Sequence, residues 1–304
     1  MSIPEPPAIV TRGLMKRFGR LVAVRALDLQ VEPGQVFGFL GQNGAGKTTT
    51  IRMLLDLLRP TAGRAEILGH DCQADGLAAR ALVGYMPGEI GFYRDMTGRR
   101  ALGVLAELAR GAVRADRQRE LCERMALDDA DLDRPIREYS TGMKRKLAAV
   151  AAFQHDPPVL LLDEPTEGLD PLMQEAFYEL LADARAGGTT VFLSSHVLSE
   201  VDRVCDRIGL LRAGELVLTA PIGEVRRTAP RLVRVTFRRP VVGPPSAWPP
   251  SIEIVEVAAA RWIVRAYGSI GPVVESLGGL PVADLEVREP RLEDVVMAYY
   301  RGQQ

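Results

Sequence analysis

Cysteine is scarce in this sequence of 304 residues, which contains only Cys72, Cys122 and Cys205. The three lie far apart and form no Cys-x-x-Cys pair, which argues against both a disulfide framework and a zinc site. We therefore expect free thiols and a reducing compartment such as the cytoplasm.

Long hydrophobic runs are missing as well. The longest apolar stretches, around residues 147–153 and 159–162, fall far short of the roughly 20 residues that a membrane-spanning helix needs. The first ten residues hold three prolines and no apolar segment, so they do not resemble a signal peptide. We expect any work on a membrane to pass through a partner protein.

Neither sign of charge is in excess, because 38 Lys and Arg residues stand against 39 Asp and Glu residues. The chain therefore lacks a global field that would attract nucleic acid, and we expect no nucleic-acid partner. Hydrophobic residues make up 47% and charged residues 25%, which is typical of a globular protein. The length predicts one large core and a smaller second domain.

Strand-like and helix-like patterns alternate over the first part of the chain, up to about residue 220. Apolar residues recur close to every second position in Leu21–Val31, and residues 36–40 form a short apolar run. Residues 48–58 have helical spacing, which we expect to end before Pro60. The runs at 159–162 and 191–193 are typical of parallel strands buried on both faces.

Two further regions differ from this α/β pattern in the spacing of their apolar residues. Apolar residues recur every three to four positions between about 96 and 152, which predicts an inserted helical subdomain over about 90–158. Beyond residue 224 the chain has short alternating runs at 233–237, 252–257 and 261–267, and an amphipathic helix at 291–301. We expect one domain over residues 1–224 and a small α+β domain over 225–304.

Residues 41–48 match the phosphate-loop pattern G-x-x-x-x-G-K-[ST] and lie between a predicted strand and a predicted helix. Glycines allow successive backbone N–H groups to surround phosphate oxygens. Lys47 would reach the β- and γ-phosphates, and Thr48 would offer its hydroxyl to Mg²⁺. The predicted nucleotide-binding residues here are Gly41, Gln42, Asn43, Gly44, Ala45, Gly46, Lys47, Thr48 and Thr49.

An acid pair, Asp163 and Glu164, follows the apolar run 159–162. Acids at the carboxyl end of a parallel strand point into the crevice where ligands bind. Asp163 would hold Mg²⁺, directly or through water, and Glu164 would polarise the attacking water. Such a pair alone also fits a simple strand end, but the upstream phosphate loop favours the catalytic interpretation.

Four further segments resemble the motifs of ABC ATPases. Residues 139–144, Tyr-Ser-Thr-Gly-Met-Lys, resemble the Leu-Ser-Gly-Gly-Gln signature, and they precede the acid pair as in that family. Residues 168–170, Gly-Leu-Asp, resemble the D-loop with Asp170, and residues 194–196, Ser-Ser-His, resemble the switch with His196. Phe18 resembles the aromatic residue that stacks on adenine.

The resemblance implies an ABC cassette: an α/β P-loop NTPase with a RecA-like core, an antiparallel β-subdomain and an inserted helical subdomain. It also implies ATP hydrolysis with Mg²⁺ in a head-to-tail dimer with a second copy or a homologous cassette. Lys47, Glu164 and His196 would act on one ATP. The signature residues of the partner chain would contact the same ATP in trans; in this sequence they are Ser140, Thr141, Gly142 and Met143.

The chain departs from the family at residues 84–89, Gly-Tyr-Met-Pro-Gly-Glu. Gly88 stands where the family has a glutamine that contacts Mg²⁺ and the attacking water. Whether Glu89 replaces this glutamine stays open, since a carboxylate there would bind Mg²⁺ more strongly or repel the γ-phosphate. We hypothesise that hydrolysis persists with an altered metal dependence.

The Ser-Thr-Gly-Met variant of the signature and residues 290–295, Pro-Arg-Leu-Glu-Asp-Val, are similar to exporters of the drug-resistance type. This resemblance implies export of a drug, antibiotic or lipid-like compound through an integral membrane permease, with this subunit at the cytoplasmic face of the membrane. Phe92, Tyr93 and Arg94 would border the groove that receives a permease helix. An ordinary surface loop is the alternative for this segment.

Two other functions compete with transport. A soluble ABC ATPase that acts on ribosomes or DNA is disfavoured, because the chain has no second cassette, long coiled-coil insertion or zinc module. A nucleotide-binding regulator without hydrolysis is disfavoured because Glu164 and His196 are both present.

Overall fold

The computed structural model describes residues 6–109, 113–228, 230–243, 248–289, 292, 293, 295 and 296. The chain packs as two compact units, Met1–Thr219 and Ala220–Gln304, and each is described by itself. The boundary that we predict after residue 224 would fall inside helix α9 (Ile222–Thr228), and it stays a prediction. Within the described part of the chain, every helix is too short or too polar to cross a lipid bilayer.

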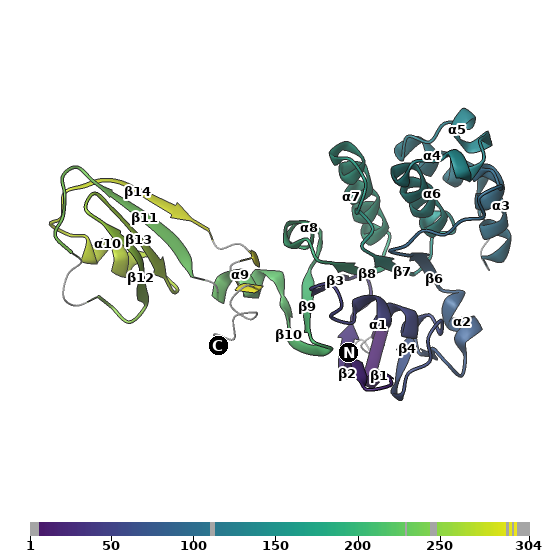
Figure 1. The fold of residues 1–304 in the computed structure, drawn as a ribbon, viewed down its shortest axis with the longest axis horizontal. Coiled ribbons are helices and arrows are strands. Elements are labelled where there is room, and N and C mark those ends of the chain that lie inside the picture. Colours follow the sequence, from purple (N-terminus) through teal and green to yellow (C-terminus); the bar gives the residue numbers. More distant parts are fainter. Residues whose placement is uncertain are drawn as a thin grey trace, which may run out of the picture. The chain divides into compact units, whose positions relative to one another are not determined.

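A six-stranded sheet forms the centre of the first unit, in the order β10-β9-β3-β8-β7-β6 (Figure 1). Adjacent strands from β9 to β6 pair in parallel. Every residue of β3, β7 and β8 is buried, as expected of central parallel strands. The strand bounds are β3 (Val36–Gly41), β6 (Val83–Met86), β7 (Val159–Asp163), β8 (Thr190–Ser195), β9 (Arg207–Arg212) and β10 (Glu215–Pro221).

A second, four-stranded sheet has the order β2-β1-β4-β5 and pairs antiparallel. Its strands are β1 (Ile9–Phe18), β2 (Leu21–Val31), β4 (Ala62–Ile67) and β5 (His70–Asp71). Leu14 and Val24 of this sheet share one apolar core with Phe37 and Phe192 of the parallel sheet, and with Ile51 of helix α1. The antiparallel subdomain of the expected cassette fold is thus confirmed.

Helix α1 spans Lys47–Leu54. It ends four residues before residue 58, where the helical spacing of apolar residues predicts its end. The cause is Asp56, whose φ of 53° lies in the left-handed region and turns the chain out of the helix. The N–H groups of Leu57 and Leu58 both donate to the Arg52 carbonyl, at 2.9 and 3.1 Å. This local turn ends the helix before Pro60 exerts any effect.

The region predicted to be helical contains α3 (Gly98–Leu108), α4 (Ala115–Arg124), α5 (Asp129–Asp133), the short 3₁₀ helix η1 (Ile136–Glu138) and α6 (Thr141–Phe153). Figure 1 shows these helices grouped beside the β6–β7 end of the parallel sheet. Helix α2 (Gly76–Arg80) precedes β6. The inserted helical subdomain is therefore confirmed as part of the cassette fold.

Helices α7 (Pro171–Ala186) and α8 (Leu198–Val204) follow β7 and β8. Helix α8 approaches the backbone of β3 closely at Gly38. A Cβ atom at that position would lie 2.5 Å from Val201 Cγ1 and 2.9 Å from Cys205 Sγ. The missing side chain of Gly38 therefore allows α8 to rest directly on the strand.

The second unit contains an antiparallel sheet in the order β12-β13-β11-β14. Its strands are β11 (Arg231–Phe237), β12 (Ile252–Ala258), β13 (Arg261–Ala266) and β14 (Val282–Arg288), with helix α10 (Gly271–Ser276) before the last strand. Trp262 packs edge-on against Phe237, with ring centroids 4.5 Å apart. The helix predicted over 291–301 lies largely outside the described residues.

Candidate functional site

The phosphate-loop residues form a turn between β3 and α1, as the pattern predicts. Gly46 caps the N-terminus of α1 with a φ of 113°. A Cβ atom there would lie 2.5 Å from the Ala23 carbonyl oxygen, so this position excludes any side chain. The backbone N–H groups at the start of α1 are thus left to face a phosphate, where the helix dipole favours negative charge.

Lys47 is the first residue of α1 and is only 6% exposed. Its Nζ donates to the Gly41 carbonyl at 2.5 Å and lies 3.2 Å from Glu164 Oε1. A buried ammonium group needs such partners, because burial without them would strongly disfavour its charge. The side chain is therefore held over the loop by a carbonyl on one side and a carboxylate on the other.

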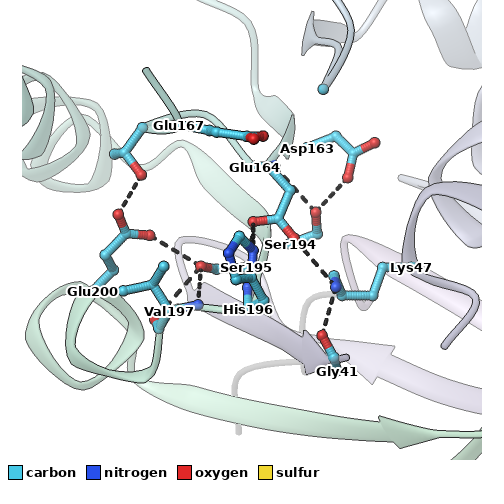
Figure 2. Close-up of polar contacts among 12 residues, drawn as sticks. Gly41, Lys47, Asp163, Glu164, Glu167, Ser194, Ser195, His196, Val197 and Glu200 are labelled. Atoms are coloured by element: carbon cyan, nitrogen blue, oxygen red, sulfur yellow. Dashed lines mark hydrogen bonds and ion pairs between the residues drawn. The ribbon is translucent and has the colours of Figure 1, made fainter. Parts of the chain in front are cut away.

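Asp163 and Glu164 lie at the carboxyl end of β7, next to β8. The Ser194 hydroxyl donates to Asp163 Oδ1 at 2.5 Å, which fixes one oxygen of this buried carboxylate. Glu164 has a φ of 49°, in the left-handed region, and its N–H donates to the Ser194 carbonyl at 3.1 Å. This turn aims the Glu164 side chain towards Lys47 and His196 (Figure 2).

His196 contacts the same carboxylate from the end of β8. Its Nδ1 lies 2.8 Å from Glu164 Oε2, and its backbone N–H donates to this oxygen at 3.3 Å. The structure thus brings Lys47, Glu164 and His196 together around one carboxylate, although they come from three separate segments. Such a group can hold a water molecule for in-line attack on a phosphate bound at the loop.

Thr48 and Asp163 are the candidate magnesium ligands. A hydroxyl and a carboxylate are oxygen donors of the kind that Mg²⁺ prefers beside phosphates. The second oxygen of Asp163 faces Gly88, where a Cβ atom would lie 3.3 Å from Oδ2. No side chain at residue 88 covers this oxygen, and the hydroxyl and carboxylate donors fit Mg²⁺.

The signature residues form the start of α6. Ser140 caps this helix, and its hydroxyl accepts from the Met143 N–H at 3.1 Å. Ser140 and Thr141 are exposed, while Gly142 and Met143 are half-buried. They belong to a different helix from the phosphate loop, and the exposure of Ser140 and Thr141 makes the start of this helix accessible to another chain.

Two further predicted residues have simple local roles in this chain. Asp170 caps α7, where its carboxylate accepts from the Met173 N–H at 3.0 Å. Phe18 ends β1 with 48% of its surface exposed, and Lys16 Nζ lies 5.1 Å from the ring centroid. An exposed ring at this position is available for stacking on a base.

Glu89 is exposed, whereas the neighbouring Gly88 lies beside Asp163. The Gly88 carbonyl accepts from Arg145 Nη1 at 2.9 Å. The structure therefore brings Gly88 to the candidate metal ligand through its backbone, and the role of Glu89 stays a hypothesis.

Sequence reasoning missed two residues that support the site. Glu200 of α8 accepts hydrogen bonds from Thr166 Oγ1 and, at 3.0 Å, from Ser195 Oγ. Arg145 of α6 is 4% exposed. The helical spacing from Arg145 to the buried Ala149 could have placed this charge on the buried face of α6.

The sequence is similar to those of known proteins. Residues 24–167 match the family model described as ABC transporter. The daunorubicin resistance ATP-binding protein DrrA3 of Streptomyces coeruleorubidus is 35% identical over 95% of both chains. The bacitracin transport ATP-binding protein BcrA of Enterococcus faecalis is 37% identical over 72% of this chain and 71% of its own length.

Solved structures agree with the fold. An ATP-binding subunit of an ABC transporter is 27% identical with a TM-score of 0.67, over 72% of this chain and 92% of its own. A dimeric ATP-binding cassette bound to ADP and phosphate is 21% identical with a TM-score of 0.64, over 70% of this chain and 98% of its own. The second likeness concerns the fold alone.

Proposed function

Because this chain belongs to the ABC transporter family of ATP-binding proteins, we propose that it binds and hydrolyses ATP to drive export through a membrane permease. The cargo would be a drug, an antibiotic or a lipid-like compound. The group formed by Lys47, Glu164 and His196 beside the phosphate loop is the observation that carries this proposal.

The residues divide the chemistry between them. Lys47 and the loop N–H groups would bind the β- and γ-phosphates, and Phe18 would stack on the adenine. Glu164 would orient the attacking water and accept its proton, while His196 holds the carboxylate in place. Mg²⁺, bound by Thr48 and Asp163, would neutralise charge on the β- and γ-phosphates.

The partner of this site would be a second cassette. The exposed Ser140 and Thr141 at the start of α6 would contact the γ-phosphate bound to the other chain, together with Gly142 and Met143. A head-to-tail dimer of identical chains then contains two such composite sites. Closing the dimer would complete the hydrogen-bond donors around the phosphate, and hydrolysis would open it.

The names of two relatives support export and a location at the membrane. The proteins from Streptomyces coeruleorubidus and Enterococcus faecalis are named for daunorubicin resistance and bacitracin transport. By analogy, this chain would lie at the cytoplasmic face of the membrane against a permease. Tyr93, which is 82% exposed, would form part of the permease contact with Phe92 and Arg94.

Complementation between inactive chains tests the composite site. A Lys47→Ala chain keeps its signature, and a Ser140→Ala chain keeps its phosphate loop. Mixed dimers would therefore hold one intact site each, and we expect an equal mixture to recover up to about a quarter of the unmutated ATPase rate. The measurement is phosphate release from the mixture and from each chain alone.

A second mixture provides the control. Lys47→Ala and Glu164→Gln alter the same half of the site, so their mixed dimers contain no intact site and should stay inactive. Recovery in both mixtures, or in neither, would contradict the assignment in trans. An unmutated chain that releases phosphate no faster than Lys47→Ala would contradict the proposed ATP hydrolysis itself.

A further inference from the structure

Arg145 connects three segments of the cassette beneath its surface. Its Nε donates to the Glu167 carbonyl at 2.7 Å, and its Nη1 donates to the carbonyls of Gly88 at 2.9 Å and Pro87 at 3.3 Å. Its Nη2 lies 3.7 Å from the Glu167 carboxylate. The signature helix α6 is thus joined to the segments that follow β6 and β7.

The burial of this guanidinium indicates that the connection is specific. A charge that is 4% exposed destabilises the fold unless acceptors surround it. Burial lowers the pKa of Arg145, while the carboxylates of Glu167, Asp163 and Glu164 raise it. Because the donors of a guanidinium form a rigid planar fork, the three carbonyls are held at fixed positions relative to α6.

Both segments held by Arg145 adjoin the catalytic carboxylates. The Gly88 backbone lies against Asp163, as the short distance from a Cβ atom at Gly88 to Asp163 Oδ2 indicates. Glu167 belongs to the turn that begins at Glu164, where the Glu167 N–H donates to the Glu164 carbonyl at 3.3 Å. A displacement of α6 would therefore move both carboxylates through Arg145.

We propose that Arg145 is a positioning residue that couples the two ATP sites of the dimer, because it joins the signature helix to the ends of β6 and β7. Ser140, at the start of the same helix, would contact the nucleotide of the opposite site. Arg145 would transmit that contact to Asp163 and Glu164 of its own site. This inference rests on the proposed function.

The test compares Arg145→Met and Arg145→Lys with Arg99→Met in the full-length chain. Methionine retains much of the apolar side-chain volume without the charge, and lysine retains the charge without the fork. Arg99 of α3 is exposed and pairs with Asp129 and Asp133, so its substitution removes ion pairs from the same subdomain without touching Gly88. The measurements are kcat, the Hill coefficient for ATP and the Kd for ADP.

For Arg145→Met we expect kcat to fall roughly 10- to 100-fold, since small displacements of catalytic groups have effects of this size. The Hill coefficient should fall towards 1, whereas the Kd for ADP should change less than about two-fold, as the phosphate loop is intact. Arg145→Lys should give an intermediate kcat, and it replaces the methionine variant if that variant does not fold. Arg99→Met should match the unmutated chain.

Three results would overturn the coupling. The first is a kcat and a Hill coefficient for Arg145→Met that equal those of Arg99→Met. The second is a Hill coefficient of 1 in the unmutated chain. The third is a parallel loss of ADP binding and kcat in Arg145→Met, which would indicate a purely structural role. An unmutated chain without ATP hydrolysis would contradict the proposed function first, and the role of Arg145 with it. The two failures are therefore distinguishable.

Discussion

The Glu164 carboxylate links Lys47 and His196 within one chain. One of its oxygens lies 3.2 Å from Lys47 Nζ, and the other lies 2.8 Å from His196 Nδ1. With both oxygens held, the side chain has a single orientation relative to a phosphate at the loop. Such positioning matters, because phosphoryl transfer depends mainly on geometry and charge.

Replacement of this carboxylate by an amide separates binding from hydrolysis. Glu164→Gln keeps the size of the side chain but removes the proton acceptor, so we expect kcat to fall about 100-fold or more with ATP affinity changed only a few-fold. Phosphate release and equilibrium ATP binding would be measured together. Glu179→Gln on the exposed face of α7 is the control, and a Glu164→Gln rate within a few-fold of the control would contradict the assignment.

The exposed Glu89 allows a test of the altered metal dependence. If it approaches the metal site in the closed dimer, Glu89→Gln and Glu89→Ala should shift the Mg²⁺ concentration for half-maximal hydrolysis by several-fold, since carboxylates are preferred ligands. ATPase rates over a Mg²⁺ titration would show this, with Glu179→Gln again as the control. Unchanged rates and Mg²⁺ profiles in both variants would remove Glu89 from the site.

At the scale of elements, the start of α6 combines a helix cap with a proposed catalytic role. Ser140 caps α6 in the same way that Thr97 caps α3, where Thr97 Oγ1 accepts from the Arg100 N–H at 3.2 Å. Loss of either cap should lower the free energy of unfolding by about 1 kcal/mol. Only Ser140 belongs to the proposed site in trans.

We therefore expect Ser140→Ala and Thr97→Ala to lose similar stability, while Ser140→Ala alone loses ATP hydrolysis. Removal of one donor to a transition-state oxyanion typically costs 100- to 1000-fold in kcat, and we expect an effect towards the lower end. Urea unfolding and phosphate release would be compared for both variants. Equal ATPase rates in the two would assign Ser140 a capping role alone.

The sequence pattern predicted those elements whose structure depends on residues close together in the sequence. Strand β2 follows its alternation of apolar residues, and the turn before α1 follows its glycines. The contacts of Arg145 were not predictable in this way, because its acceptors Gly88 and Glu167 lie 57 and 22 positions away in the sequence. The early end of α1 depends on the left-handed backbone of Asp56, which no spacing of apolar residues reveals.

At the scale of the whole molecule, three buried thiols make stability depend on pH. Burial raises the pKa of Cys72 to about 12 and that of Cys122 to about 11, and it raises the pKa of Cys205 as well. In the unfolded chain these thiols ionise near pH 9, so below that pH they are protonated in both states and stability is at its full value. As the pH rises from 9 towards the raised pKa values, the unfolded chain releases these protons first and the folded state loses stability.

The free energy of unfolding should therefore fall above pH 9 by up to about 1.4 kcal/mol per thiol and pH unit. Urea unfolding at pH 7, 9 and 10 would show the decline. A Cys72→Ala variant starts from lower stability but should decline less steeply, because one thiol is missing. Equal slopes in the variant and the unmutated chain would show that other groups cause the decline.

Transport tests the surface that faces the proposed permease. Tyr93→Ala should abolish transport by the assembled transporter while the purified chain keeps its basal ATPase rate, because the residue is 82% exposed and lies outside the proposed catalytic group. Tyr267→Ala, an exposed tyrosine of the second unit, is the control. Parallel loss of transport and basal hydrolysis would count against a coupling role for Tyr93.

The close approach of α8 to β3 at Gly38 has a consequence for any survey of mutations. A single added methyl group at Gly38 would push against Val201 and Cys205 of the segment that follows His196. The histidine would shift with this segment, and activity would fall although no atom of residue 38 reaches the phosphate loop. A screen for inactive variants would therefore select Gly38 as if it were catalytic, although its contribution is only that it leaves space for α8 by having no Cβ atom.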